Sequence, residues 1–234
     1  TGAWNIAYGE QAYIWNELAA SSHFYFKIFP YTNYGSYINY KTDGTIPAAE
    51  ATTQAILHLY NFDDGLDPWT QFSVTGDQTW VHDTIHGIDG SGCAKMSGYS
   101  AANLDNQDWL ISPALDLTNA NNTKLHFYNA ENYGNGTNPL VVLISTDYSS
   151  GNPTTNGSWT DISLEIALSE GAWAWTPSGY VDISAYNQSN VHIAFKYTST
   201  TADAPTWEVD NVLITSTSGV GVNEAETNGP AFEV

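Results

Sequence analysis

The sequence predicts an all-β fold, a jelly-roll sandwich of two sheets, and three observations support this prediction. Apolar and polar residues alternate from Val191 to Tyr197, which is the period of a strand with one buried face. Turn sequences such as Gly134-Asn135-Gly136 and Asn156-Gly157 separate the apolar runs at spacings typical of a sandwich. Aromatic residues make up 14% of the 234 residues, and this chain length and composition can supply the core of a large β domain.

Other segments of the chain fit the same prediction. The runs 125–127 and 140–144 have the character of buried strands. A helix is conceivable only at 48–60 and 162–169. Thr52 and Thr53 lower the helical preference of the first segment, and Gly171 ends any helix in the second quickly. The chain is therefore expected to be β throughout its ordered part.

The charge of the chain restricts its partners. Twenty-five acidic residues face five basic ones, and the formal net charge is −20. A field of this sign repels phosphates and anionic lipid headgroups, so nucleic acids and membranes are excluded as partners, whereas divalent cations are attracted. The single cysteine, Cys93, excludes an internal disulfide and is expected to be a small buried residue. The sequence has no apolar run of about 20 residues that could span a bilayer.

One segment carries a resemblance to a known family. Residues Asp108–Leu117 read Asp-Trp-Leu-Ile-Ser-Pro-Ala-Leu-Asp-Leu. Tyr60–Gly65, Trp69 and Trp80 precede it, and the segments 124–130, 141–146, 179–186, 191–197 and 207–214 follow it in order. This order resembles the cleaved-adhesin or choice-of-anchor J family, bacterial surface domains related to the gingipain adhesins with a MAM-like jelly roll. The resemblance covers residues 56–215 and implies a jelly-roll sandwich without catalytic activity.

The two ends of the chain resemble parts of other bacterial surface proteins. His23–Tyr31 and 39–45 are similar to the last strands of a fibronectin type III-like domain, which needs roughly seven strands in all. Ala231–Val234 resembles the residues that precede the sorting domain of type IX secreted proteins. We therefore expect a partial fibronectin type III-like segment with a linker at 1–53, the jelly-roll domain at 54–215, and at 216–234 a flexible tail preceding a removed sorting signal.

The incomplete N-terminal segment leaves three alternatives. Its strands can dock on the second domain, remain as frayed remnants, or pair with strands of another molecule, because two or three strands cannot bury both faces of a hairpin. Docking is the favoured alternative. Pairing between chains would build an extracellular filament.

No catalytic motif is expected. His82-Asp83-Thr84-Ile85-His86 imitates the helix of a zinc protease with Asp in place of Glu. The β-branched Thr84 and Ile85 and the following Gly87 favour a strand that enters a loop, which would not place both imidazoles on one face. The chain is therefore predicted not to be an enzyme.

Calcium is the expected cofactor, because hard cations need six to eight oxygen ligands and the chain is rich in Asp, Asn and turns. Asp63 and Asp64 follow the first predicted strand of the sandwich, and Asp210 and Asn211 lie in the last one. The family resemblance implies that such acids share a metal site. Asp108 is a further candidate ligand. The alternative is that these acids cap turns and Asp108 accepts backbone hydrogen bonds.

Exposed aromatic rings in loops can stack on sugar rings, and the expected ligand-binding residues are aromatic. They are Trp173, Trp175, Trp159, Tyr148 and Tyr133. The alternative is that most of them belong to the core, as expected for Trp69, Trp80, Trp109 and Trp207.

Two function classes follow from the resemblance and the composition. The first is a secreted or cell-surface adhesion module that binds a glycan or a surface protein. The second is a structural subunit of an extracellular assembly that contacts other copies of itself.

Overall fold

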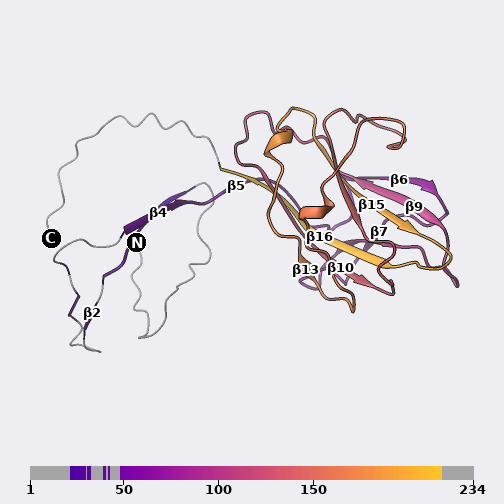
Figure 1. Ribbon diagram of the computed structural model, residues 1–234, viewed down its shortest axis with the longest axis horizontal. Coiled ribbons are helices and arrows are strands. Elements are labelled where there is room, and N and C mark those ends of the chain that lie inside the picture. The colour runs from indigo at the N-terminus through magenta and orange to yellow at the C-terminus, as the bar shows by residue number, and fades with distance from the viewer. Residues whose placement is uncertain (1–21, 30, 33–38, 41, 43–47, 218–234) are drawn as a thin grey trace. The chain divides into compact units, whose positions relative to one another are not determined.

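The computed structural model describes residues 22–29, 31–32, 39–40, 42 and 48–217, and the chain divides into two compact units, residues 1–55 and 56–234 (Figure 1). In the first unit, β1 (His23–Lys27) pairs antiparallel with β4 (Ala48–Thr52), and β2 (Tyr31–Thr32) pairs with β3 (Asn39–Tyr40). Most of the predicted tail lies outside the described residues, and the likeness to a fibronectin type III-like domain stays a prediction.

The second unit contains two β-sheets. The seven-stranded sheet has the order β13-β10-β16-β8-β7, with β14 also pairing with β10 and β5 with β16. Its strands are β5 (Ala55–Tyr60), β7 (Val81–Asp83), β8 (Cys93–Ser97), β10 (Lys124–Asn132), β13 (Thr176–Pro177), β14 (Val181–Asp182) and β16 (Thr206–Ser216). The five-stranded sheet has the order β12-β11-β15-β9-β6. Its strands are β6 (Thr70–Thr75), β9 (Asn106–Ile111), β11 (Val141–Ser145), β12 (Thr160–Asp161) and β15 (His192–Ser199).

The prediction of an all-β jelly-roll sandwich is confirmed. The described residues include two short 3-10 turns, η2 (Ser163–Glu165) and η3 (Ser184–Tyr186), and no α-helix. Within the same residues, no helix is long and apolar enough to cross a membrane. The segments 48–60 and 162–169 form strands and a 3-10 turn, respectively.

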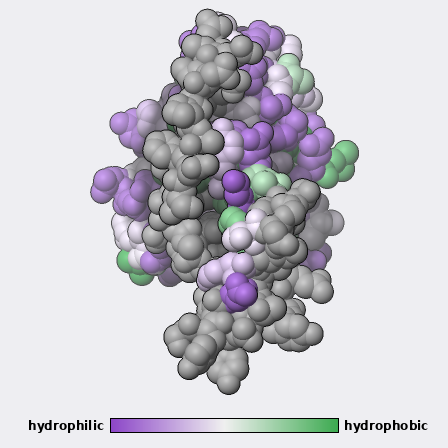
Figure 2. Space-filling model, turned by 90° about the vertical axis from the view of Figure 1, so that its left-hand side faces the viewer, coloured by the Kyte–Doolittle hydropathy of each residue, from purple (hydrophilic) through white to green (hydrophobic). Residues whose placement is uncertain are grey.

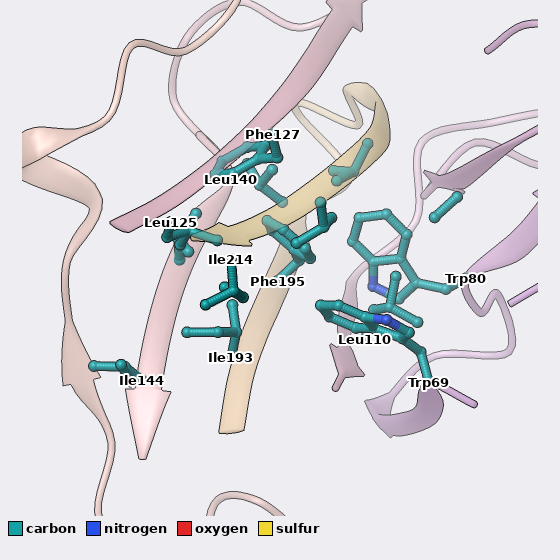
Figure 3. Packing of buried hydrophobic residues seen from close by; sticks show 14 of the residues in the cluster. Trp69, Trp80, Leu110, Leu125, Phe127, Leu140, Ile144, Ile193, Phe195 and Ile214 are labelled. Atoms are coloured by element: carbon teal, nitrogen blue, oxygen red, sulfur yellow. The ribbon is translucent and has the colours of Figure 1, made fainter. Parts of the chain in front are cut away.

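The main core lies between the two sheets, because its members come from strands of both. Phe195 on β15 stacks on Trp69, with 5.6 Å between ring centroids, and meets the edge of Phe127 on β10 at 5.0 Å. Figure 3 shows these side chains and their neighbours pointing toward one another. The prediction that Trp69, Trp80, Trp109 and Trp207 are core residues is confirmed, since each is at most 5% exposed.

A second apolar cluster covers the outer face of the five-stranded sheet. Along β9, Leu110 enters the main core, whereas Trp109 and Ile111 point to the other face, as the period of a strand requires. Tyr148 and Trp159 pack on Trp109 from the connection between β11 and β12. The ammonium of Lys196 lies 5.8 Å from the centroid of the Trp109 ring.

The outer face of the seven-stranded sheet carries charged residues. Glu208 on β16 lies opposite Lys95 on β8, while the neighbouring Trp207 and Val209 belong to the main core. The register between β10 and β16 then shifts, and Asn211 has a left-handed φ of 51°. This bulge follows directly after Asp210, whose side chain is fully buried.

Candidate functional sites

An exposed tyrosine ring and a half-buried tryptophan ring meet at the end of β10. Tyr133 follows this strand, Trp173 lies in the loop before β13, and their ring centroids are 5.6 Å apart at an angle of 88°. Three residues here have left-handed backbones, Tyr133 (φ 68°), Ala172 (φ 57°) and Trp173 (φ 59°). The amide of Trp173 donates to the carbonyl oxygen of Glu131 at 3.0 Å, which fixes the loop against the strand. Tyr133 is nevertheless 74% exposed.

Such backbone conformations cost free energy for residues other than glycine, and they persist only where the surrounding structure holds them. We call Tyr133 and Trp173 the aromatic pair. The conformations that hold it could not be read from the sequence, because neither residue type favours a left-handed backbone.

A charged cluster borders the aromatic pair. The ammonium of Lys95 lies 5.6 Å from the Trp173 ring centroid, 2.9 Å from Asp83 Oδ2 and 3.4 Å from Glu208 Oε1. The imidazole Nδ1 of His86 lies 2.8 Å from the same Asp83 oxygen. Burial opposes ionisation of Asp83, but the hydrogen bonds from His86 and Lys95 hold its pKa well below the ordinary value.

The carboxylates of Asp83 and Glu208 and the imidazole of His86 lie within 4.8 Å of one another. The Lys95 ammonium forms ion pairs with both carboxylates and offsets one of their two negative charges, so the cluster contains a cation of its own. His82 is not part of it, since its side chain lies against Gly92. The two histidines of the protease-like segment therefore contact different residues.

A second cluster of oxygen atoms surrounds Asp210. Its Oδ2 accepts a hydrogen bond from the Ile88 amide at 3.0 Å, and its Oδ1 accepts one from the Asn211 amide at 2.6 Å. Burial raises the pKa of Asp210 to about 6, although both hydrogen bonds oppose the shift, and the negative charges of Asp89 and Asp63 raise it further. A buried carboxylate beside two other acids favours a cation in its surroundings.

Two glycines allow backbone oxygens and the Asp210 side chain to approach one another closely. A Cβ atom on Gly92 would collide with the carbonyl oxygen of Phe62 and with Nε2 of His82, and would lie 3.0 Å from the Asp63 carbonyl oxygen. A Cβ atom on Gly87 would lie 2.9 Å from Asp210 Oδ2 and would collide with the Gly92 carbonyl oxygen. Carbonyl and carboxylate oxygens are the ligands that Ca²⁺ prefers. The groups that therefore fit a bound calcium ion are Asp63, Asp210 and the carbonyl oxygens of Phe62 and Gly92, and we call them the oxygen cluster.

Of the five predicted metal ligands, the structure brings Asp63 and Asp210 together. Asn211 is adjacent through its backbone, and Asp64 is exposed in the turn after Asp63. Asp108 is separate, since it lies in the five-stranded sheet and alternates with Trp109 toward the main core. Both carboxylate oxygens of Asp108 are buried without a hydrogen-bond partner among the described residues. Sequence reasoning missed His82, Gly87 and Gly92, for which the glycine-rich run 87–92 was the available signal.

The five predicted aromatic ligand residues divide into separate groups. Tyr133 and Trp173 form the aromatic pair. Tyr148 and Trp159 lie on the outer face of the five-stranded sheet, with 5.2 Å between ring centroids, and Tyr148 is only 4% exposed. Trp175 is half-buried next to β13. On the face shown in Figure 2, the described residues are mostly hydrophilic and the hydrophobic ones are isolated.

The fold and these clusters define a β-sandwich with an exposed aromatic pair and an acidic oxygen cluster. The family model described as a domain of unknown function (DUF5017) matches residues 114–230, half of the chain, so the chain belongs to this family. No curated protein matches it.

Solved structures similar to this chain include cleaved adhesin domains of Lys-gingipain. The K3 cleaved adhesin domain of Lys-gingipain from Porphyromonas gingivalis is 15% identical with a TM-score of 0.50, and the match covers 69% of this chain and 100% of that domain. The K1 domain of the same protein is 22% identical with a TM-score of 0.49, over 68% of this chain and 97% of that one. A xylan-binding domain from Paenibacillus barcinonensis is 18% identical with a TM-score of 0.44, over 72% and 98%. The similarity to K3 shows a shared fold.

Proposed function

We propose that the chain is a non-catalytic extracellular binding module that contacts a glycan or a surface protein through the aromatic pair. The observation that carries this proposal is the exposure of Tyr133 and the half-exposure of Trp173 in backbone conformations that are costly for both. Aromatic rings held at a surface supply large contact areas at little entropic cost. The fold shared with a domain named as an adhesin supports the same assignment.

Polar groups next to the aromatic pair favour a glycan over a protein. Asn132 and Asn138 are half-buried at the end of β10 and in the following loop, and the exposed Asn135 lies between them. Within the chain, Oδ1 of Asn132 accepts from the Tyr133 amide, Oδ1 of Asn135 accepts from the Thr137 amide, and Nδ2 of Asn138 donates to Asp203. The Nδ2 groups of the first two amides and the Oδ1 atom of the third are the groups that would pair with sugar hydroxyls. Lys95 offsets one of the two carboxylate charges of Asp83 and Glu208, and the negative charge that remains beside Trp173 disfavours an anionic ligand relative to a neutral one.

Replacing either ring should abolish most of the binding. We expect Trp173→Ala and Tyr133→Ala each to weaken binding to a glycan identified on an array by about thirtyfold, or about 2 kcal/mol. Tyr180→Ala is the matched control, because this tyrosine is 64% exposed on another strand connection and should leave the affinity unchanged. Isothermal titration calorimetry measures the affinities, and thermal unfolding verifies that the variants are folded. The proposal is wrong if Trp173→Ala and Tyr133→Ala both bind the glycan with the wild-type affinity, as the control does.

We also propose that the oxygen cluster holds a structural calcium ion. Asp63 and Asp210, with the carbonyl oxygens of Phe62 and Gly92, would be its ligands. The ion would neutralise the buried carboxylate and tie the turn after β5 and the loop 84–92 to β16.

Calcium should therefore stabilise the protein. After dialysis against a chelator, we expect saturating Ca²⁺ to raise the melting temperature, with a gain of about 2.7 kcal/mol at a hundredfold excess over the dissociation constant. Asp210→Asn should lose this response, whereas Asp77→Asn, an exposed acid, should retain it. A wild-type melting temperature that is the same with chelator and with Ca²⁺ contradicts a structural ion.

Self-assembly is a second candidate function, and the N-terminal unit supports it. The strands β1 and β4 form a two-stranded sheet, and Tyr25 and Ile28 are 77% and 66% exposed. Such an open ribbon can accept a strand from another molecule. We then expect light scattering to show dimers or polymers that disappear when residues 1–53 are removed. An unchanged monomer before and after the deletion excludes this function.

A further inference from the structure

A pocket of about 400 Å³ lies at one end of the five-stranded sheet. It forms where β6 and β15 begin and where β9 and β11 end, because these neighbouring strands are antiparallel. In the described part of the chain, the residues that line it carry hydroxyl, amide, aromatic and imidazole groups, and none carries a carboxylate or an ammonium group. Its volume is within the range of small-molecule sites, about 300 to 1,000 Å³.

A buried histidine contributes an acceptor to this pocket. His192 is 5% exposed, its Nδ1 lies 2.8 Å from the Ser112 carbonyl oxygen, and its ring meets Tyr148 edge-on at 5.1 Å. Because the carbonyl can only accept, Nδ1 donates, and Nε2 of the neutral ring is left as an acceptor. Nε2 has no hydrogen-bond partner among the described residues, and this atom keeps some exposure to solvent. Since His192 lines the pocket, this nitrogen is available to a ligand there.

The pocket walls are fixed by hydrogen bonds within the chain. The side-chain Nδ2 of Asn190 donates to the Tyr148 carbonyl oxygen at 2.7 Å, which leaves the side-chain Oδ1 as an acceptor. The Tyr148 hydroxyl donates to the Gly151 carbonyl oxygen at 3.0 Å. The exposed side chains of Gln71 and Ser149 stand at the opening. The pocket is therefore formed before a ligand arrives, which reduces the entropic cost of binding.

We propose that this pocket is a second ligand site that takes one neutral sugar unit. A charged ligand would lose its hydration without gaining a counter-charge, whereas sugar hydroxyls can pair with the neutral donors and acceptors of the walls. The net charge of −20 further disfavours acidic sugars. An apolar sugar face can pack on the half-buried ring of Phe72. The site is separate from the aromatic pair, and it does not depend on that pair's function.

The test is an NMR titration of the whole chain with the methyl glycosides of glucose, galactose and mannose. At least one should shift the backbone amides of residues 70–72, 112–114 and 149–151, with a dissociation constant on the order of 1–10 mM. Glucosamine and N-acetylneuraminic acid, which are charged, should bind at least about tenfold more weakly. The proposal is overturned if none of the three glycosides shifts these amides at about 50 mM. It is also overturned if the charged sugars bind with the same affinity as the neutral ones.

Two variants test the pocket itself. His192→Asn can keep a donor to Ser112 and removes the Nε2 acceptor, so affinity should fall about tenfold. Ser149→Trp places a large side chain at the exposed opening without altering the core, so the amide shifts should vanish in a protein that remains folded. Shifts that persist in Ser149→Trp overturn the site. Tyr133→Ala should leave the shifts of the pocket amides 70–72, 112–114 and 149–151 unchanged, which distinguishes failure of this site from failure of the aromatic pair.

Discussion

Phe195→Ala is expected to lower the free energy of unfolding by about 3–5 kcal/mol, the largest single effect that the structure predicts. Phe195 is fully buried and touches Trp69 and Phe127, so its ring joins the two sheets at the centre of the main core. Truncation removes the transfer free energy of the ring and leaves a cavity that the rigid sheets can fill only in part. The geometries with Trp69 and Phe127 contribute beyond the buried area alone.

Urea denaturation monitored by tryptophan fluorescence measures this loss. Phe195→Leu is a matched control that keeps most of the volume and should cost much less. Leu164→Ala is a second control, because this leucine is completely exposed and its truncation should stay within about 0.5 kcal/mol of the wild type. A loss below about 1 kcal/mol for Phe195→Ala would show that the ring is not central to the core.

Asp108→Asn is expected to stabilise the protein at pH 7 by about 2 kcal/mol, the second of the large effects. Asp108 faces the main core with both oxygens buried and unpaired. Its cross-strand neighbour Ser73 donates its hydroxyl to the Gly76 carbonyl oxygen at 3.2 Å. Burial raises the pKa of Asp108 to about 6, although the nearby Ser73 hydroxyl opposes the shift, which means that the charged form is unfavourable in the folded state. Asparagine keeps the shape and removes the charge.

The sign of the pH dependence follows from the same shift. Below about pH 4 the carboxyl is protonated in both the folded and the unfolded state. As the pH rises from about 4 to 6, the unfolded state loses its proton first, so stability falls across this interval and is then constant. Asp108→Asn should reduce this fall. In protein freed of Ca²⁺ by a chelator, Asp210, whose pKa burial also raises to about 6, still contributes to it.

Urea denaturation at pH 4, 5, 6 and 7 measures the pH dependence, and Asp77→Asn serves again as the exposed control. A variant that is less stable than the wild type at pH 7, with an undiminished slope between pH 4 and 6, would show that the Asp108 carboxylate has favourable partners in the folded protein.

The fold was largely predictable because strand periodicity is a local property of the sequence. The alternation from Val191 to Tyr197 predicts a strand, and β15 spans His192–Ser199. The four tryptophans expected in the core are buried. Segment 162–169 was the less certain case, and it forms a 3-10 turn, because Gly171 and the nearby strand β12 leave no room for longer helical structure.

The sites were less predictable because they depend on contacts between distant parts of the chain. Asp210 accepts a hydrogen bond from the amide of Ile88, which is 122 positions away in the sequence. The bulge at the neighbouring Asn211 is not marked by any local sequence pattern. The pocket around His192 forms from the ends of four strands that are far apart in the sequence but lie side by side in the sheet. Asp108 was expected to bind a metal ion or to accept backbone hydrogen bonds, yet its place in β9 turns it toward the core.

The three lysines of the second unit are all engaged. Lys95 pairs with Asp83 and Glu208, Lys124 pairs with Asp182 at 2.6 Å, and Lys196 lies over Trp109. These three ammonium charges offset only a small part of the acidic charge of the chain, and the repulsion of anions extends over about 10 Å at 0.1 M salt. The long-range electrostatic field thus repels negatively charged molecules but does not discriminate among uncharged ones. Selection among uncharged molecules depends on contacts at van der Waals distance.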